Sequence, residues 1–547
     1  MSISNYTGQC VVVLSAASLQ QFIFQSNRLK ENIGASYLAK CCLEEDLIKT
    51  IQMSEYSISI KEWKTYTDKV SGTSDRIPKP EVPIQQNVDV NLIYVGGGNA
   101  ALLCKSRDVA KKIVKAWSRK LLNAAPGLRV IVGYGEVKDA LATAYRTALE
   151  YLTRCEEALP FGATLGSLPV VRNCTSTGLP ASRKSREPYE PNQWIAEPAS
   201  RKRQATDQND TTNEINSALK EGQKFALQPE KDLGGSEGQS YIAVVYADGN
   251  GIGGLLNKVI DEPQDNNKFL HNLRAFSASV SHQSLQALLA TLYHFQSVLP
   301  QLKDDLAVDT TSVFPIRPII FGGDDLTFVC DGRLGLYLAA YYLREFTERE
   351  IIVLGEPKLV DACAGVAIVP TKFPFAQAYG FADELCGLAK TYRRDEKNSK
   401  GSWLDFQIIQ AGVTSSIATL RETQYRSLED GHPLHDRPYE VMKTKAQKPQ
   451  SWDVFEELLQ GFQSDEWPRS RAKGLMQALT QGPAVTAQFI EAAKWRNIEL
   501  PHYKNMHQST HDTGWTTLKR TPYFDPLEVL DFYIAIEEKD TDEVEQT

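Results

Sequence analysis

The feature that most constrains this chain is a Gly-Gly-Asp-Asp turn between two short apolar runs. The turn consists of Gly322, Gly323, Asp324 and Asp325. Residues 318–321 precede it and residues 326–330 follow it, and both runs are rich in β-branched and aromatic side chains. Two such runs joined by Gly-Gly predict a β-hairpin with two carboxylates at its tip. Adjacent acids in a tight turn repel each other, so we expect a divalent cation to neutralise them.

A third carboxylate, Asp248, lies just after another apolar run, residues 241–246. It opens a glycine-rich loop that precedes a predicted helix. The candidate nucleotide-binding residues are Gly249, Asn250, Gly251 and Gly253 of this loop, together with Gly322 and Gly323 of the turn. Glycines in such a loop let backbone N–H groups approach phosphate oxygens, helped by the N-terminus of the following helix. The loop is therefore suited to a metal-bound triphosphate.

Composition excludes several classes of protein. The chain has 547 residues and is 42% hydrophobic, which favours about three to four globular domains. No apolar stretch approaches the ~20 residues that span a bilayer, and no signal-peptide pattern opens the chain. The nine cysteines include no Cys-x-x-Cys pair, which argues against a zinc ribbon and predicts a reduced, cytoplasmic setting. The net charge of −8 argues against nonspecific coating of nucleic acid.

Hydrophobic periodicity divides the chain into four segments. Residues 1–175 alternate between helical and strand-like patterns, and residues 239–412 repeat this alternation. Residues 176–238 are polar and charged, which predicts a long linker or a disordered insertion. Within that segment the basic residues 201–203 could touch nucleic acid, but a solvated loop is the favoured interpretation. Residues 413–547 are expected to be mainly helical.

The order of elements in residues 239–412 resembles the ferredoxin-like β-α-β-β-α-β unit. That topology places the end of the first strand beside the tip of the central hairpin, so we expect Asp248 to face Asp324 and Asp325. Carboxylates that bridge two metals can activate an attacking hydroxyl and stabilise a leaving pyrophosphate. Because the ligands are oxygens without a His/Cys cluster, Mg²⁺ or Mn²⁺ is predicted. Lys390, just past an apolar helix, is a candidate partner for the triphosphate.

Each of these features also has a plainer interpretation. An Asp-Asp pair in a glycine turn is most often only a solvated hairpin, and a glycine-rich loop alone is a weak signal. A lysine at the end of a helix usually serves the helix dipole. Their occurrence together, in the order of one ferredoxin-like unit, favours a nucleotide site instead.

Four elements carry a resemblance to a known family, namely residues 248–253, 322–325, 364–367 and 404–406. Together they resemble the cyclase-type palm of the large subunit of type III CRISPR effector complexes, the Cas-ten or Cmr-two family. Elements that resemble its first palm and the start of its C-terminal helical region are residues 21–24, 28–31, 34–38 and 437–439. The resemblance implies an α+β fold with two ferredoxin-like palm domains and a C-terminal helical domain.

The resemblance also implies an enzyme, a nucleotidyl cyclase that makes cyclic oligoadenylate second messengers from ATP, or from another NTP, in antiviral defence. The family's metal positions match Asp248, Asp324 and Asp325, and Lys390 matches a phosphate contact. The implied partners are an RNA-guided effector complex and its RNA, which switch the cyclase on. A homodimer is another assembly that the sequence permits.

The sequence departs from the family at several points. Residues 92–104 are predicted to form a hairpin. Its turn, residues 96–99, reads Gly-Gly-Gly-Asn where a metal hairpin would need acids, so the first palm is expected to be catalytically silent. Asn250 occupies a position that is often acidic, which would weaken one metal. No His-Asp nuclease motif precedes the first palm, and the His-Asp pairs at 435–436 and 511–512 are interpreted as structural, so DNase activity is not predicted. The zinc-ligand cysteines of many relatives are missing, since Cys174 is alone.

Two other functions stay open from the sequence. Related palms share the metal hairpin, so the first alternative is a diguanylate-cyclase-like enzyme or a linear nucleotide polymerase. The second is a non-catalytic nucleotide sensor or a scaffold of an RNA-guided complex. Loss of ATP turnover on Asp324→Asn would favour an enzyme, and the mass of the product would separate a cyclase from a polymerase.

Overall fold

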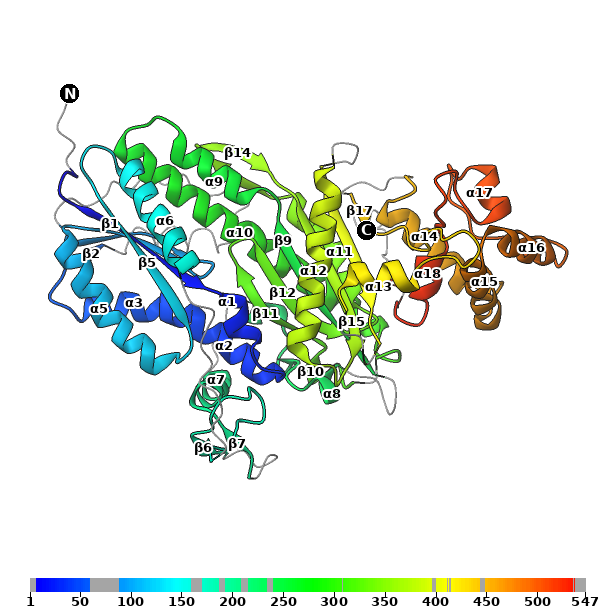
Figure 1. Cartoon of the computed structure of the whole chain (residues 1–547), viewed down its shortest axis with the longest axis horizontal. Helices are drawn as coiled ribbons and strands as arrows, with labels where there is room; N and C mark the ends of the chain where they lie inside the picture. The colour runs from blue at the N-terminus through cyan, green and yellow to red at the C-terminus, as the bar shows by residue number, and fades with distance from the viewer. Residues whose placement is uncertain are drawn as a thin grey trace, which may run out of the picture.

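The computed structural model describes most of the chain. The described residues are 6–59, 88–158, 170–185, 192–207, 215–233, 240–306, 308–395, 400–410, 412, 415–442, 448–534 and 536. Figure 1 shows two halves of sheet and helix, with a group of shorter helices at the C-terminal end. The fold is therefore α+β, with several sheets. No helix in the described residues is long and apolar enough to cross a membrane.

The N-terminal half is built on a five-stranded sheet with the strand order β2-β3-β4-β1-β5. Its strands are β1 (Cys10–Ala17), β2 (Ile58–Ser59), β3 (Val90–Gly96), β4 (Asn99–Cys104) and β5 (Arg129–Glu136). β1 lies between β4 and β5 and is antiparallel to both, and β3 and β4 form an antiparallel hairpin. This is the order of a β-α-β-β-α-β unit with β2 added at one edge. It confirms the hairpin predicted around residues 96–99.

Helices complete this half. They are α1 (Leu19–Phe24), α2 (Leu29–Leu43), α3 (Glu45–Gln52), α5 (Arg107–Ala124) and α6 (Leu141–Ala158). α6 packs on β5 and β1. In α5 the buried residues Ala110, Ile113 and Trp117 recur every three or four positions, which gives the helix one apolar face. The Trp117 indole N–H donates to the Cys42 carbonyl at 2.8 Å and ties α5 to α2.

The second half is built on a six-stranded sheet with the order β11-β12-β9-β15-β16-β17. Its strands are β9 (Tyr241–Gly249), β11 (Ile316–Gly322), β12 (Asp325–Asp331), β15 (Ala362–Pro370), β16 (Ser402–Ile408) and β17 (Tyr439–Val441). β12 and β15 flank β9 and are antiparallel to it, and β16 runs parallel to β15. Strands β11, β12, β9 and β15 have the ferredoxin-like order predicted from the sequence, and β16 and β17 extend it.

Successive side chains of β9 point to opposite faces of the second sheet, and each face belongs to a different hydrophobic core. The helices of this half are α9 (Ile252–Asp261), α10 (Asn266–Val298), α11 (Gly335–Thr347) and α12 (Phe375–Arg394). Val244 and Tyr246 lie in the core that contains the buried face of α12, whereas Val245 and Ala247 share a core with α10 and α11. The core of α12 also includes the buried residues of the N-terminal sheet. The two halves are therefore packed together through one hydrophobic core.

Residues 201–203 lie on a helix, which corrects the prediction of a solvated loop. They belong to α7 (Glu197–Asp207), which packs against α2. Lys202 is 1% exposed, and its Nζ donates to a backbone carbonyl of α1 at 2.5 Å. Arg203 Nε pairs with the buried Glu31 carboxylate at 2.8 Å. The prediction failed because charged side chains that find distant partners cannot be told from solvated ones in the sequence.

Other short elements occur in the segment predicted as a linker and around the second sheet. They are β6 (Arg183–Lys184), β7 (Trp194–Ile195), β8 (Lys224–Phe225), α8 (Pro229–Asp232), β10 (Val313–Phe314), β13 (Glu350–Val353) and β14 (Glu356–Leu359). In Figure 1, β6, β7 and α7 project from the body below α2. Part of the segment predicted as a linker is thus folded, and the boundaries of the four segments stay predictions.

Helices alternate with loops in the described part of residues 413–547, which also contributes β17 to the second sheet, and a separate helical domain stays a prediction. The helices of this region are α13 (Ile417–Gln424), α14 (Trp452–Gln463), α15 (Arg469–Gln481), α16 (Pro483–Lys494), α17 (Gln508–Thr513) and α18 (Phe524–Glu528). The short α18 packs against α14 and α15. Aromatic side chains of α14 contact β17, because the Trp452 and Phe455 rings pack around Tyr439.

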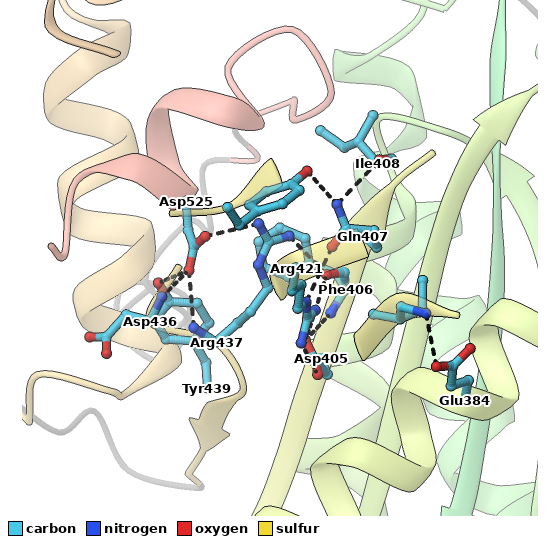
Figure 2. A network of polar contacts seen from close by, with 12 residues as sticks. Glu384, Asp405, Phe406, Gln407, Ile408, Arg421, Asp436, Arg437, Tyr439 and Asp525 are labelled. Atoms are coloured by element: carbon cyan, nitrogen blue, oxygen red, sulfur yellow. Dashed lines mark hydrogen bonds and ion pairs between the residues drawn. The ribbon is translucent and has the colours of Figure 1, made fainter. Parts of the chain in front are cut away.

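A buried ionic network joins this helical region to the second sheet (Figure 2). The Arg437 side chain is fully buried and pairs with Asp525 at 3.0 Å and with Glu528 at 2.5 Å, both on α18. It also donates to a backbone carbonyl of β16 at 2.8 Å. Beside it, Arg421 of α13 pairs with the buried Asp405 of β16 at 2.7 Å. Because each buried charge has an opposite charge beside it, the network fixes the helical region on the sheet.

Candidate functional site

The Gly-Gly-Asp-Asp turn closes the β11–β12 hairpin, as predicted. Gly322 pairs with Asp325 in the ladder, so Gly323 and Asp324 form the loop between them. Gly322 has φ +151° and Gly323 has φ +65°, conformations that L side chains rarely adopt. This backbone therefore favours glycine at both positions, and it places the two acids at the hairpin tip.

The three predicted carboxylates come together at the ends of the adjacent strands β9 and β12. Asp248 of β9 is the register partner of Asp325 of β12. Asp324 lies next to Gly249, because a Cβ placed on that glycine would be 2.9 Å from the Asp324 Cβ. The ferredoxin-like order thus places Asp248 beside the hairpin acids, although more than 70 residues separate them in the chain. Their roles stay predictions.

Burial and like charge disfavour ionisation of the hairpin acids. Burial raises the pKa of Asp324 to about 7, and the charges of Asp325 and Asp248 add to the effect. Burial, and then the charge of Asp248, raises the pKa of Asp325 to about 6. At neutral pH the site therefore gathers carboxylates that repel one another, and a bound divalent cation would relieve that repulsion.

Lys390, the predicted phosphate contact, pairs with one of these acids. α12 places its Nζ in an ion pair with the Asp248 carboxylate, and the same ammonium donates to the Gly249 carbonyl at 3.3 Å. Burial disfavours the charged lysine, but the charge of Asp248, the hydrogen bond to it and two nearby cysteines together outweigh burial, so the pKa of Lys390 is raised. The ammonium therefore stays protonated and neutralises one of the three acids.

The glycine-rich loop leads into α9. Gly251 is the N-cap of that helix with φ +75°, and no atom of the described residues lies within 4 Å of a Cβ placed on Gly251 or on Gly253. This open helix N-terminus suits a phosphate group. Asn250 is engaged elsewhere, because its Nδ2 donates to Asp361 Oδ1 at 2.6 Å and its backbone N–H donates to the Asp361 carbonyl at 2.8 Å. Asn250 therefore anchors the loop beside β15, and its nucleotide contact stays a prediction.

The β3–β4 hairpin of the first half repeats the backbone of the Gly-Gly-Asp-Asp hairpin. Gly96 has φ +154° and Gly97 has φ +58°, close to the values of the two glycines in the second hairpin. The tips of the two hairpins touch, because a Cβ placed on Gly97 would lie 3.5 Å from the Gly323 Cα. The candidate site therefore lies where the two halves of the protein meet.

The first hairpin tip has no carboxylate. Gly98 and Asn99 follow its glycine pair where the second hairpin has its two acids, and Ser15 is the register partner of Asn99. Leu19 fills the space beside Gly98, since a Cβ there would lie 2.8 Å from the Leu19 Cδ2. Without acids at these positions, the tip lacks ligands for a divalent cation. The catalytic silence of the first half stays a prediction.

Two residues of the site were not predicted from the sequence. Tyr246 precedes Asp248 by two positions on β9, and its hydroxyl donates to Asp325 Oδ1 at 2.9 Å. Burial, then the charges of Asp325 and Asp248, raises the pKa of Tyr246, so the hydroxyl keeps its proton. Asp383 lies two helical turns before Lys390 on α12, and burial, then the charge of Asp248, raises the pKa of Asp383. Side chains repeat on one face every 2 residues in a strand and every 3.6 residues in a helix. Tyr246 could therefore have been predicted beside Asp248, and Asp383 on the face of Lys390.

The donor set fits a hard divalent cation. All three acids offer carboxylate oxygen, which Mg²⁺ and Mn²⁺ prefer. Across the part of the chain that the structure describes, no three or more His, Cys, Asp or Glu side chains are grouped so that they could hold a metal ion. Asp248 is paired with Lys390 instead. A cation that uses Asp248 must therefore displace the ammonium.

The fold of the two sheets and the helical region is similar to that of Csm1 in solved Csm1–Csm4 cassettes. Solved structures of Csm1–Csm4 cassettes match nearly the whole chain. A cassette in complex with one ATP matches with a TM-score of 0.51 and 13% identity, over 97% of this chain and 71% of that chain. A cassette in complex with cA4 matches with a TM-score of 0.50 and 12% identity, over 98% and 71% of the two chains.

A third cassette, in complex with pppApApA, matches with a TM-score of 0.50 and 11% identity, over 97% of this chain and 70% of that chain. No protein-family model matches the sequence, and no curated protein matches it. The structural likeness therefore confirms the predicted resemblance at the level of the fold.

The raised pKa values predict how stability depends on pH. Asp324 and Asp325 bind protons more tightly in the folded state than in the unfolded chain, so a rise in pH from about 4 to about 7 lowers stability. Without metal, we expect Asp324→Asn to melt roughly 1–3 °C higher than the wild type at pH 8. At pH 4 the two proteins should melt together, because the carboxyl of Asp324 is then protonated.

Differential scanning calorimetry in EDTA at several pH values measures this effect. Mn²⁺ should raise the melting temperature of the wild type at pH 8 and should do so less for Asp324→Asn. A variant that melts below the wild type at pH 8, or a constant difference at every pH, would show that the carboxylates do not repel each other in the fold.

Proposed function

We propose that this protein is a nucleotidyl cyclase of the palm type that converts ATP to cyclic oligoadenylate. The observation that carries the proposal is the convergence of Asp248, Asp324 and Asp325 at the ends of adjacent strands. The Csm1–Csm4 cassettes that share the fold were solved in complex with ATP, pppApApA and cA4, which supports adenine nucleotides as the ligand class.

The proposal assigns a role to each segment of the chain. Residues 1–175 form a degenerate ferredoxin-like palm, and residues 239–412 form the catalytic palm. Residues 176–238 are an insertion between them, and residues 413–547 are a helical domain. The Csm1 chains reported above were solved in cassettes with Csm4, which supports a partner complex for this chain as well. In this account the protein acts in the cytoplasm, in antiviral defence, when such a complex binds RNA.

Asp248, Asp324 and Asp325 would hold Mg²⁺ or Mn²⁺. When bound, these cations would activate the attacking hydroxyl and stabilise the leaving pyrophosphate. The protein's contribution is to place the backbone of the three acids before the nucleotide arrives, while the Asp248 side chain must still be released from Lys390. The glycine backbone of the hairpin fixes two of them, and the ladder between β9 and β12 fixes the third beside them. Groups held in advance need little reorganisation during the reaction.

Backbone and lysine groups would bind the triphosphate. The open N-terminus of α9 at Gly251 and Gly253 directs N–H groups outward, where phosphate oxygens can accept from them. The Lys390 ammonium lies at Asp248, so it can turn from that carboxylate to a phosphate once a cation occupies the acids. Phosphoryl transfer of this kind depends mainly on positioning and on stabilisation of charge.

Lys390→Met should change the affinities for Mn²⁺ and for ATP in opposite directions. Removal of the ammonium frees Asp248, so Mn²⁺ alone should bind about threefold more tightly. ATP at saturating Mn²⁺ should bind about 10-fold more weakly, because a charged hydrogen bond to phosphate is lost. Isothermal titration calorimetry measures both affinities.

Lys358→Met on the exposed strand β14 is the matched control, and it should change neither affinity. Unchanged ATP affinity in Lys390→Met would remove Lys390 from the nucleotide site. Failure of the wild type to bind ATP in a metal-dependent manner would argue against the proposed function itself.

A further inference from the structure

Tyr246 lies where the two halves of the protein meet, beside the candidate metal site. It is 4% exposed, and it lies on β9 two residues before Asp248. Its register partner on β12 is Thr327, two residues after Asp325. Because side chains two positions apart point to the same face of a strand, Tyr246 lies on the sheet face of both acids.

A directed chain of hydrogen bonds passes through this tyrosine. The Gln20 Nε2 of α1 donates to the Tyr246 hydroxyl at 3.3 Å. The Tyr246 hydroxyl donates in turn to Asp325 Oδ1 at 2.9 Å. An amide nitrogen can only donate, so its bond occupies a lone pair of the hydroxyl and leaves the hydroxyl proton for the carboxylate. Gln20 belongs to the first half of the protein and Asp325 to the second.

We propose that Tyr246 is a positioning residue that holds the Asp325 carboxylate ready for a divalent cation, and that Gln20 sets the orientation of its hydroxyl. The proposal rests on the proposed function, since it concerns the same acids. It gives the first half, which has no acids at its hairpin tip, a definite role in the site.

The need for such a residue follows from the charges at the tip. Asp325 is opposite Asp248, and two carboxylates at adjacent positions turn away from each other unless donors hold them. The hydroxyl of Tyr246 engages Oδ1 of Asp325, so the other oxygen is left for a ligand. Groups that hydrogen-bond to metal ligands in this way orient them, and their removal typically weakens metal binding by about 10–100-fold.

The neighbouring Tyr379 provides a matched control. Its ring stacks on Phe24 with centroids 3.8 Å apart, and it meets the Tyr246 ring edge-on at 5.6 Å. Among the described residues its buried hydroxyl has no hydrogen-bond partner. Tyr246→Phe and Tyr379→Phe therefore remove the same atom from adjacent, buried rings, and only one of these atoms contacts a carboxylate.

The experiment measures the Kd of Mn²⁺ without nucleotide, from the electron paramagnetic resonance signal of free Mn²⁺. We expect Tyr246→Phe to raise the Kd about 10-fold. Tyr379→Phe should leave the Kd at the wild-type value. Gln20→Leu removes only the outer hydrogen bond and should raise the Kd about threefold. Melting temperatures of all variants show that they are folded, and Gln20→Leu carries the test if Tyr246→Phe does not fold.

The outcomes separate this inference from the proposed function. If Asp325→Asn lowers Mn²⁺ affinity but Tyr246→Phe and Gln20→Leu bind like the wild type, the positioning role is wrong and the metal site stands. Equal weakening by Tyr246→Phe and Tyr379→Phe would also overturn it, because general packing would then explain both. If the wild type binds no Mn²⁺, or Asp325→Asn binds it equally well, the metal site of the proposed function fails.

Discussion

Asp248→Asn and Asp324→Asn should each lower kcat/KM for ATP by about 100-fold or more, the effect of losing roughly 3 kcal/mol of charge stabilisation. Each substitution keeps the shape of the side chain and removes a negative oxygen from the convergent acids. Asp324→Asn should fold normally, because it relieves repulsion between neighbouring carboxylates. Release of pyrophosphate from ATP, in the presence of Mg²⁺ or Mn²⁺, measures the loss.

Glu356→Gln is the matched control for these substitutions. Glu356 lies on the exposed strand β14, away from the hairpin tip in sequence, and its amide variant should turn over ATP like the wild type. Turnover that survives in both Asp248→Asn and Asp324→Asn would mean that the acids are a solvated turn and not a metal site.

Arg437→Met should destabilise the protein by about 3–5 kcal/mol, the usual cost of removing one partner from a buried ion pair. The substitution leaves Asp525 and Glu528 without the guanidinium that lies 3.0 and 2.5 Å from them. It also removes the donor to β16, so the helical region loses a connection to the second sheet. Urea denaturation followed by tryptophan fluorescence measures the change, because Trp452 lies in this region.

Arg107→Met provides the comparison for an exposed pair. Arg107 pairs with Glu136 at 3.0 Å, and both side chains are about half exposed. Loss of such a pair should cost less than about 1 kcal/mol. If both substitutions lowered the free energy of unfolding equally, the Arg437 network would stabilise the protein no more than a surface ion pair does.

Local patterns were sufficient to predict the part of the fold that carries the site. Gly322 and Gly323 predict their hairpin because few other residues adopt the positive φ values that the turn requires. Apolar runs mark β9, β12 and β15, and their order limits the topology to one that places Asp248 beside the hairpin tip. The convergence of the three carboxylates was therefore predictable from residue types and their order.

Pairings between distant residues were not predictable in the same way. The basic residues of α7 resemble a solvated loop in the sequence, yet Lys202 and Arg203 find partners about 170 residues away. Lys390 was predicted as a phosphate contact, and its ion pair with Asp248 depends on the packing of α12 on the sheet. Tyr246 looks like an ordinary strand residue until the register with Asp325 is known. Such contacts follow from tertiary packing, which no local pattern contains.

Mass spectrometry of the products formed from ATP distinguishes a cyclase from the other two functions. Purified protein is incubated with ATP and Mg²⁺ or Mn²⁺ beside Asp324→Asn, and metal-dependent binding of ATP is measured in the same samples. We expect cyclic oligoadenylates from the wild type and none from the variant. Linear products alone would contradict the cyclase and indicate a polymerase. The absence of both product and metal-dependent ATP binding would contradict the account as a whole.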